Sequence, residues 1–434
     1  MKEESVILTL FAAMLLGCVA VGLSVLYAMA AGLLLFSRYA LRRGFRLREV
    51  LGMWGSGVRT AKNVLISFCI IGCLTGTWRV GGTIPAIVYY ASGLIRPSVF
   101  YLVTFLLNSG LSFLMGTSFG TAGTMGLICM TIGRSLGVSV PITGGAVLAG
   151  VYFGDRCSPV STSALLVSEI TGTSLYRNIR NMVRTALVPF VLSCAFFFVL
   201  GFHSVPTQPG MDVRTVFSES FNVSWPVLLP ACAILILAAF RVPVKQTLSI
   251  GLLISIVCSL LFQRCSVIDV LRAMVLGYSS ESPELGGMMN GGGLTAMIRT
   301  GAIVLIASCY AGVFRKTPLL DGLQSLFHRI AARAGTDMGI FAASLLSVVI
   351  SCNQTLAIML TEELCEPFSR DKEAFALALE DTAVVIAAIV PWSIACSAVL
   401  AFIGAPYASI GYAVYLYLIP LWHLLWCRKH TLKQ

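Results

Sequence analysis

Four polar interruptions within apolar stretches hold the side chains of this sequence that could do chemistry. The most unusual is EDTAVVIAAIVPW, residues 380–392, in which Glu380 and Asp381 open an apolar run that contains Pro391. A carboxylate inside a bilayer is costly unless it is protonated, paired or exposed to water, so such residues are functional candidates. Burial disfavours the charged form of a carboxyl group, which lets one site exchange a proton for a cation. The alternative is that both acids begin a helix at the membrane interface, where the helix dipole favours negative charge.

The second interruption is YFGDRCSPVSTS, residues 152–163, in which Asp155 and Arg156 precede a run of hydroxyl residues. Pro159 lacks a backbone donor and frees the carbonyl group four residues earlier. That carbonyl and the hydroxyls could coordinate a cation, unless Asp155 and Arg156 are an ordinary solvated pair in a surface loop. The expected ion and proton ligands, with one serine from a matching segment near Pro391, are Asp155, Glu380, Asp381, Ser158, Ser161, Thr162, Ser163 and Ser393.

Two further interruptions have the character of re-entrant tips. GTSFGTAGTMG, residues 116–126, could offer carbonyl and hydroxyl oxygens to a cation. Its Gly116, Gly120 and Gly123 equally fit a packing face of small residues. In SCNQTLAIML, residues 351–360, the amides could instead link helices by hydrogen bonds. The residues expected to line the two tips are Thr117, Ser118, Thr121, Asn353, Gln354 and Thr355.

The composition decides which elements must position these residues. Of 434 residues, 57% are hydrophobic and 11% are charged, whereas soluble proteins carry about 25% charged residues. The chain is therefore expected to be an integral membrane protein. The apolar runs are unbroken, unlike the alternating strands of a β-barrel. They predict an all-α polytopic fold of about 10 to 12 transmembrane helices.

The basic residues indicate how the chain is oriented. The net charge is +11, but Arg and Lys occur in short groups between apolar runs, which argues against nucleic acid. Five arginines lie in residues 38–48, so this loop is expected on the cytoplasmic side of the cell inner membrane. The apolar stretch Val6 to Phe36 is too long for a removable signal. It predicts two short helices that turn near residues 17–22, with one long helix as the alternative.

Other signatures argue against an enzyme. Most of the 14 cysteines lie in apolar runs without a CxxC motif, which favours packing over redox or metal chemistry. The four histidines form no HExxH motif, and the chain has no GxxxxGK[ST] loop for ATP. We therefore expect no cofactor and no metal site beyond that of a cation held by the buried carboxylates.

Weak internal similarity suggests a repeat. Pro159 and Pro391 are as far apart along the chain as Ser161 and Ser393. Repeats of this kind are typical of secondary transporters, in which broken helices of two inverted halves meet at mid-membrane. The expected units are N-terminal helices and a basic loop (1–49), a first transport repeat (50–202), linker loops with a connecting helix pair (203–285), and a second repeat with a basic tail (286–434).

Five stretches together resemble the NhaC family of Na⁺/H⁺ antiporters, within the ion transporter superfamily. They are GTWRVGGTIPAIVYY (76–90), GTSFGTAGTMG (116–126), residues 145–182 around GDRCSPVSTS, CNQTLAIML (352–360) and LEDTAVVIAAIVPWSIACSAVLAFIGAP (379–406). The resemblance implies two inverted repeats and exchange of Na⁺ against H⁺, coupled in some relatives to lactate and malate. Where Thr162 and Asn353 stand, the family pattern has acids.

The sequence therefore predicts a secondary active transporter that works by alternating access, with Na⁺/H⁺ antiport as the first hypothesis. The alternatives are an ion-coupled carrier of a small organic acid or amino acid, and a scaffold or enzyme that retains the fold without transport. The expected partners are the lipid bilayer, a small cation and protons; an organic solute and a homodimer stay open.

Overall fold

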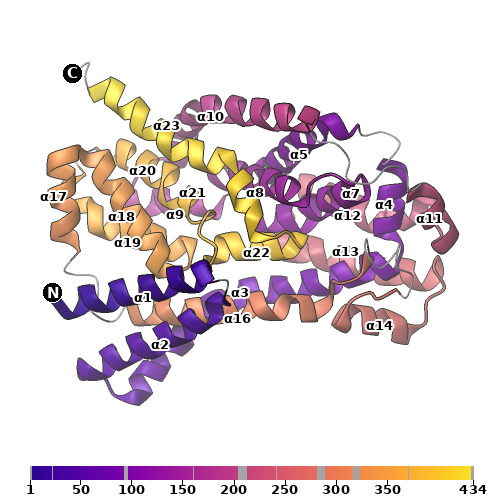
Figure 1. Ribbon diagram of the computed structural model, residues 1–434, viewed down its shortest axis with the longest axis horizontal. Helices are drawn as coiled ribbons and strands as arrows, with labels where there is room; N and C mark the ends of the chain where they lie inside the picture. The colour runs from indigo at the N-terminus through magenta and orange to yellow at the C-terminus, as the bar shows by residue number, and fades with distance from the viewer. Residues whose placement is uncertain are drawn as a thin grey trace.

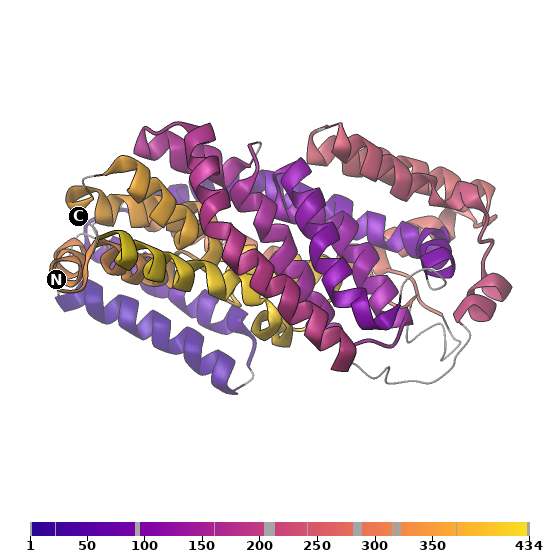
Figure 2. The same ribbon diagram turned by 90° about the horizontal axis from the view of Figure 1, so that it is seen from above.

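The protein is a bundle of α-helices, seen in a computed structural model that describes residues 2–21, 23–91, 96–159, 161–203, 213–240, 242–280, 289–314, 317, 323–369 and 371–431. This part of the chain contains no β-strand, and Tyr278 and Gly291 form an isolated antiparallel bridge. The all-α prediction is confirmed. Both termini lie at the end of the molecule that carries α17 (Gln324–Ala334), as Figures 1 and 2 show.

The N-terminal apolar stretch forms two helices, α1 (Lys2–Val21) and α2 (Val25–Arg42). The prediction of a helix pair is confirmed: α1 ends at Val21, at the end of the range in which the turn was expected, and α2 begins at Val25. Phe11 of α1 and Phe36 of α2 pack edge to face on each other and on Tyr310 of α16 (Gly293–Phe314). Aromatic contacts of this kind fix the helix pair α1 and α2 against α16.

Two long helices, α3 (Leu47–Val80) and α16, run side by side along the molecule (Figure 1). Gly57 faces Ser308 and Gly72 faces Gly293, so the two helices are antiparallel. A Cβ atom on Gly312 would lie 1.9 Å from the backbone oxygen of Met53. Small residues thus allow the two backbones to approach more closely than any side chain would permit.

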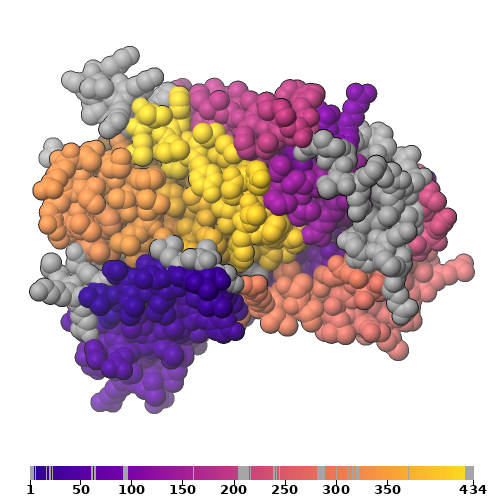
Figure 3. Space-filling view, in the orientation of Figure 1, coloured from indigo at the N-terminus to yellow at the C-terminus, as the bar shows by residue number. Residues whose placement is uncertain are grey.

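The first half of the molecule consists of α4 (Thr83–Ala91), α5 (Phe100–Met115), α6 (Ser118–Thr121), a π-helical turn (Ala122–Gly126), α7 (Leu127–Ser135), α8 (Val140–Cys157), α9 (Thr162–Thr171) and α10 (Leu175–His203). The second half consists of α17, α18 (Thr336–Ser351), α19 (Gln354–Cys365), α20 (Lys372–Asp381), α21 (Ala383–Ile386), α22 (Ile394–Ile403) and α23 (Val414–Thr431). In Figure 3, α23 lies at the surface between the helices of the second half and α10.

The backbone repeats itself between the halves at the two tips. Gly116, the residue after α5, has a left-handed φ of 64°, and Thr117 then caps α6 at a φ of −148°. Cys352, the residue after α18, has a φ of 54°, and Asn353 caps α19 at a φ of −147°. A left-handed conformation is costly for a residue other than glycine, so its presence at Cys352 shows how strongly the tip requires this turn.

The second break in each half matches as well. Ser161 caps α9, which ends at Gly172 with a φ of 65°. Ser393 caps α22, which ends at Gly404 with a φ of 62°. When Gly116 is aligned with Cys352, α16 falls on residues 57–78 within α3. Because these two helices are antiparallel, the repeats have the relation expected of inverted halves.

The connecting region differs from the expected helix pair. It contains α11 (Val213–Ser220), α12 (Leu229–Ala239), α13 (Val244–Leu261) and α14 (Val267–Leu276). Helix α14 was not expected, because Asp269 and Arg272 interrupt its apolar residues. A reciprocal capping box between Ser266 and Asp269 begins this helix. The other unit boundaries stay predictions.

Four helices in the described part are long and apolar enough to cross a membrane: Val25–Arg42, Pro97–Met115, Leu175–His203 and Gly293–Phe314. The pair Leu65–Val80 and Thr83–Tyr90, which is bent by 65°, is apolar enough only when its two helices are taken together, as a broken span or a re-entrant loop. Further apolar helices of 10–17 residues include Lys245–Leu261, Thr336–Ser351 and Ile394–Ile403. The chain is thus a polytopic membrane protein whose short helices accompany breaks; the count of 10 to 12 crossings stays a prediction.

We expect Gly312→Val to destabilise the contact between α3 and α16. The new side chain would meet the backbone of Met53, and overpacking of this kind costs about 1–3 kcal/mol or more. Gly301→Val on the same helix is the matched control, because no described atom lies within 4 Å of the added Cβ. Thermal unfolding of the purified proteins in detergent measures both. Equal melting temperatures for the two variants would contradict the assigned packing.

Candidate functional site

Asp155 lies in the last turn of α8, buried between the two tips. Its side chain is 5% exposed. The backbone N–H of Ser118 donates to Oδ1 at 3.3 Å, and the amide of Gln354 donates to Oδ2 at 3.1 Å. The same amide also donates to the carbonyl oxygen of Val384 in α21, at 3.0 Å. One carboxylate thus joins the tip of the first half to the tip of the second.

The helix break after Asp155 is closed by serine hydroxyls. Pro159 leaves the carbonyl of Asp155 without its helical partner, as the sequence predicted. Ser161 and Ser163 both donate to this carbonyl oxygen, the latter at 2.7 Å. Their hydroxyl oxygens are 2.9 Å apart, and that of Ser163 lies 3.5 Å from Oδ2 of Asp155. The hydroxyls therefore gather at Asp155 and satisfy the broken backbone.

Arg156 and Asp381 form an ion pair at the heart of the molecule, and both side chains are fully buried. Arg156 also donates to the hydroxyl of Thr185 in α10 at 2.7 Å. The solvated-loop alternative for Asp155 and Arg156 is wrong, because both residues are helical and buried. Arg156 pairs instead with a carboxylate from the other half of the chain.

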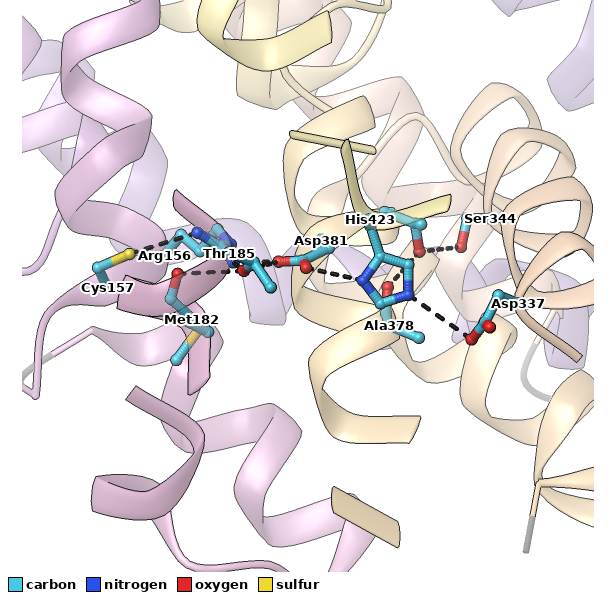
Figure 4. Close-up of polar contacts among 10 residues, drawn as sticks. Arg156, Cys157, Met182, Thr185, Asp337, Ser344, Ala378, Asp381 and His423 are labelled. Atoms are coloured by element: carbon cyan, nitrogen blue, oxygen red, sulfur yellow. Dashed lines mark hydrogen bonds and ion pairs between the residues drawn. The ribbon is translucent and has the colours of Figure 1, made fainter. Parts of the chain in front are cut away.

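Asp381 has a second partner that the sequence reasoning missed. Nδ1 of His423 in α23 lies 2.8 Å from Oδ2 of Asp381, and the ring is 1% exposed. Nε2 of the same ring lies 3.6 Å from Oδ1 of Asp337, in the first turn of α18. Figure 4 shows Asp381 between Arg156 and Thr185 on one side and His423 on the other. A lone histidine within the apolar run LIPLWHLLW was the available signal.

Glu380 is fully buried, and neither of its carboxyl oxygens has a hydrogen-bond partner among the described residues. Its carboxyl group interacts electrostatically with Arg156, Asp381 and Asp155. The helix-start alternative is wrong, because Glu380 and Asp381 end α20 rather than begin it. The C-terminal end of a helix disfavours negative charge. A buried carboxyl group in such a place needs a functional explanation.

Several residues that were predicted to line the tips form the turns there and do not touch a carboxylate. Thr117 caps α6 by accepting the N–H of Gly120, and Asn353 caps α19 by accepting the N–H of Leu356. The hydroxyl of Thr121 donates to the carbonyl oxygen of Thr117 at 2.9 Å. These side chains hold the turns that place Ser118 and Gln354 at Asp155.

The remaining candidates differ in burial. Thr162 and Thr355 are exposed. Ser158 is buried at the end of α8, and Ser393 caps α22 from a buried position. A role of any of these residues as an ion ligand stays a prediction.

The glycine string of residues 116–126 forms the turn of the tip and also permits close packing; its role in holding a cation stays a prediction. Gly116 supplies the left-handed turn of the tip. A Cβ atom on Gly123 would lie 2.9 Å from the side chain of Ile71 in α3, so this glycine also permits close packing. The π-helical turn at Ala122–Gly126 belongs to the same segment, and such turns are frequent at functional sites.

A buried carboxylate between two tips, beside broken helices in a polytopic helical protein, is typical of the class of secondary membrane transporters. The comparison with known proteins agrees and is narrower. The chain belongs to the Na⁺/H⁺ antiporter family, whose model matches residues 5–169 and 150–423. The family consists of transporters rather than enzymes.

Three relatives are similar to this chain over most of its length. The Na⁺/H⁺ antiporter NhaC of Alkalihalophilus pseudofirmus is 28% identical over 404 residues, which cover 90% of this chain and 86% of that protein. The malate-2H⁺/Na⁺-lactate antiporter of Bacillus subtilis is 26% identical, over 81% of this chain and 78% of its own length. The arginine/ornithine antiporter ArcD of Halobacterium salinarum is 27% identical, over 78% and 73%.

We expect Arg156→Met to lower the free energy of unfolding by about 3–5 kcal/mol, because it leaves the charge of Asp381 buried without its cation. Adding Asp381→Asn should recover more than half of that loss. Arg177→Met is the matched control: Arg177 pairs with Glu373 at the surface, where removing an ion pair costs about 1 kcal/mol or less. Thermal unfolding in detergent compares the four proteins. No recovery in the double variant would contradict the pairing.

Proposed function

We propose that the protein exchanges a monovalent cation, with Na⁺ as the first candidate, for protons by alternating access. The observation that carries this proposal is the charge of the buried cluster. Asp155, Glu380 and Asp381 supply three carboxylates and Arg156 one guanidinium, so the fully ionised cluster carries −3 + 1 = −2.

Such a charge is costly in a medium of low dielectric constant unless protons or cations neutralise it. A site of this kind binds either H⁺ or a small cation at the same carboxylates. Competition between the two is sufficient for antiport, provided that the site opens to one side of the membrane at a time. The two repeats, with their matching tips and breaks, are the elements that would open alternately.

The position of Arg156 favours cation exchange over the capture of an anion. Its guanidinium group is already paired with Asp381 and bonded to Thr185. It therefore acts as a fixed internal cation that offsets one of the carboxylates.

An ion-coupled carrier of a small organic acid or amino acid is the second candidate. It is supported by the likeness to relatives named for malate and lactate or for arginine and ornithine. In addition, Nε of Arg156 is buried without a hydrogen-bond partner in the described part of the chain. A solute carboxylate is a chemically suitable partner for that atom.

The proposed location is the cell inner membrane, with residues 38–48 on the cytoplasmic side because of their arginines. The proposed exchange has no covalent step, so it needs no cofactor and no enzymatic activity. Formation of a homodimer stays a prediction from the sequence.

Everted membrane vesicles loaded with a pH-sensitive dye test the proposal. Dequenching on addition of Na⁺ or Li⁺ supports cation/proton antiport. Dequenching that requires an organic acid or amino acid supports the second candidate. If no solute causes dequenching although the protein is present in the membrane, both candidate functions are contradicted and a scaffold role is favoured.

We expect Glu380→Gln to reduce Na⁺-driven proton movement at least tenfold while the protein stays as stable as the wild type or becomes more so. The reason is that Glu380 has no hydrogen-bond partner to lose within the described residues, whereas its charge belongs to the exchanging cluster. Vesicle dequenching and thermal unfolding are measured together. Glu169→Gln, which alters an exposed glutamate on α9, is the control and should exchange normally. Retained exchange in Glu380→Gln removes this residue from the site.

A further inference from the structure

We propose that Asp337, His423 and Asp381 form a proton pathway that links the buried ion pair to the surface at the beginning of α18. This inference rests on the proposed function, because it names the route by which the exchanged proton reaches the carboxylates.

Exposure falls in steps along the three side chains. Asp337 is 32% exposed, His423 is 1% exposed and Asp381 is fully buried. The three residues come from α18, α23 and α20, and Figure 4 shows them in a row. The row thus begins at a carboxyl group in contact with the surroundings and ends at the partner of Arg156.

The imidazole ring of His423 has a carboxylate at each nitrogen. A neutral imidazole donates a hydrogen bond from one nitrogen and accepts one at the other. Histidine also gains and loses a proton near physiological pH, which suits it to a shuttle. Nδ1 lies at hydrogen-bond distance from Asp381, whereas the 3.6 Å from Nε2 to Asp337 exceeds such a distance. Transfer at that end therefore requires a closer approach of Asp337.

The proton moves along the row in two steps. With Nδ1–H donating to Asp381, the lone pair of Nε2 faces Asp337. A proton taken up by Asp337 passes to Nε2, so an O–H bond breaks and an N–H bond forms. The Nδ1–H bond then breaks and its proton binds Oδ2 of Asp381. Asp337 regains its negative charge, Asp381 loses its own, and no electrons are exchanged.

The charged groups around the end of this pathway couple it to the ion site. Arg156 reaches Asp381 from α8, and Glu380 adjoins it on α20. Helix α10 contributes the uncharged Thr185, and α21 has no titratable residue. Protonation of Asp381 leaves the charge of Arg156 without its ion-pair partner, next to the buried Glu380. Arrival of the proton thereby changes the electrostatic balance of the whole cluster.

The alternative is that His423 serves as a structural bridge between helices. Helix α18 already contacts the end of α20 directly, because the hydroxyl of Ser344 lies 2.8 Å from that of Thr382, the residue after α20. A bridge also needs no ionisable ring. The substitution His423→Asn separates the two roles, since the amide can still donate to Asp381 but cannot accept and release a proton.

The test uses purified full-length protein in liposomes and two measurements. Exchange of radioactive Na⁺ against unlabelled Na⁺ needs no proton, whereas a pH-sensitive dye reports Na⁺-driven proton movement. We expect His423→Asn to reduce proton movement at least tenfold and to leave the self-exchange of Na⁺ within about twofold. Asp337→Asn should reduce proton movement at least threefold with self-exchange unchanged. The matched controls are His328→Asn and Asp371→Asn, which alter exposed residues and should leave both measurements unchanged.

Each outcome supports or overturns the pathway. Full proton movement in His423→Asn overturns it. An equal loss of both fluxes in that variant indicates a structural role and also overturns it. Should His423→Asn fail to fold, Asp337→Asn, which changes a partly exposed residue, decides the matter alone. Wild-type protein without either flux refutes the proposed function itself, a result distinct from the failure of the pathway.

Discussion

The buried ion pair of Arg156 and Asp381 is the interaction on which the rest of the site depends. Taking both charges out of water costs more than a single contact returns, unless other hydrogen bonds complete the arrangement. Thr185 and His423 supply those bonds. The pair joins the break after α8 in the first half to the end of α20 in the second. Any movement of one half relative to the other must therefore either carry this pair along or separate it.

The same pair also decides where Asp155 points. Successive residues of an α-helix are about 100° apart around its axis, so a helix that presents Arg156 to Asp381 presents Asp155 to a different face. That face meets Ser118 and Gln354 at the two tips. A single helical turn thus places an acid between the tips and a base against the other half. The adjacency of Asp155 and Arg156, which suggests a simple surface pair, instead separates two roles.

Much of this arrangement was predictable from local sequence. The acids in apolar runs, the carbonyl freed by Pro159 and the matching Ser and Pro positions of the two halves all follow from chemistry within a few positions. The partners of those acids did not, because Arg156 and Asp381 are distant in the chain and no local rule pairs them. His423 was not predicted, because a single histidine in an apolar helix forms no motif with its neighbours in the sequence. Helix α14 was not predicted, because charged residues interrupt its short apolar face.

Glu380 and Asp381 are neighbours in the chain with opposite surroundings, and this contrast bears on how exchange could proceed. Asp381 has a cation, a hydroxyl and an imidazole against its carboxylate. Within the described part of the chain, Glu380 has no donor to replace the water that it lost on burial. An ionised Glu380 is therefore stable only with a bound cation or a nearby charge released from another partner. If a proton neutralises Asp381, Arg156 becomes that charge, and a cation at Glu380 loses its advantage. Entry of the proton and departure of the cation would then follow from one redistribution of charge, without a large motion at the site.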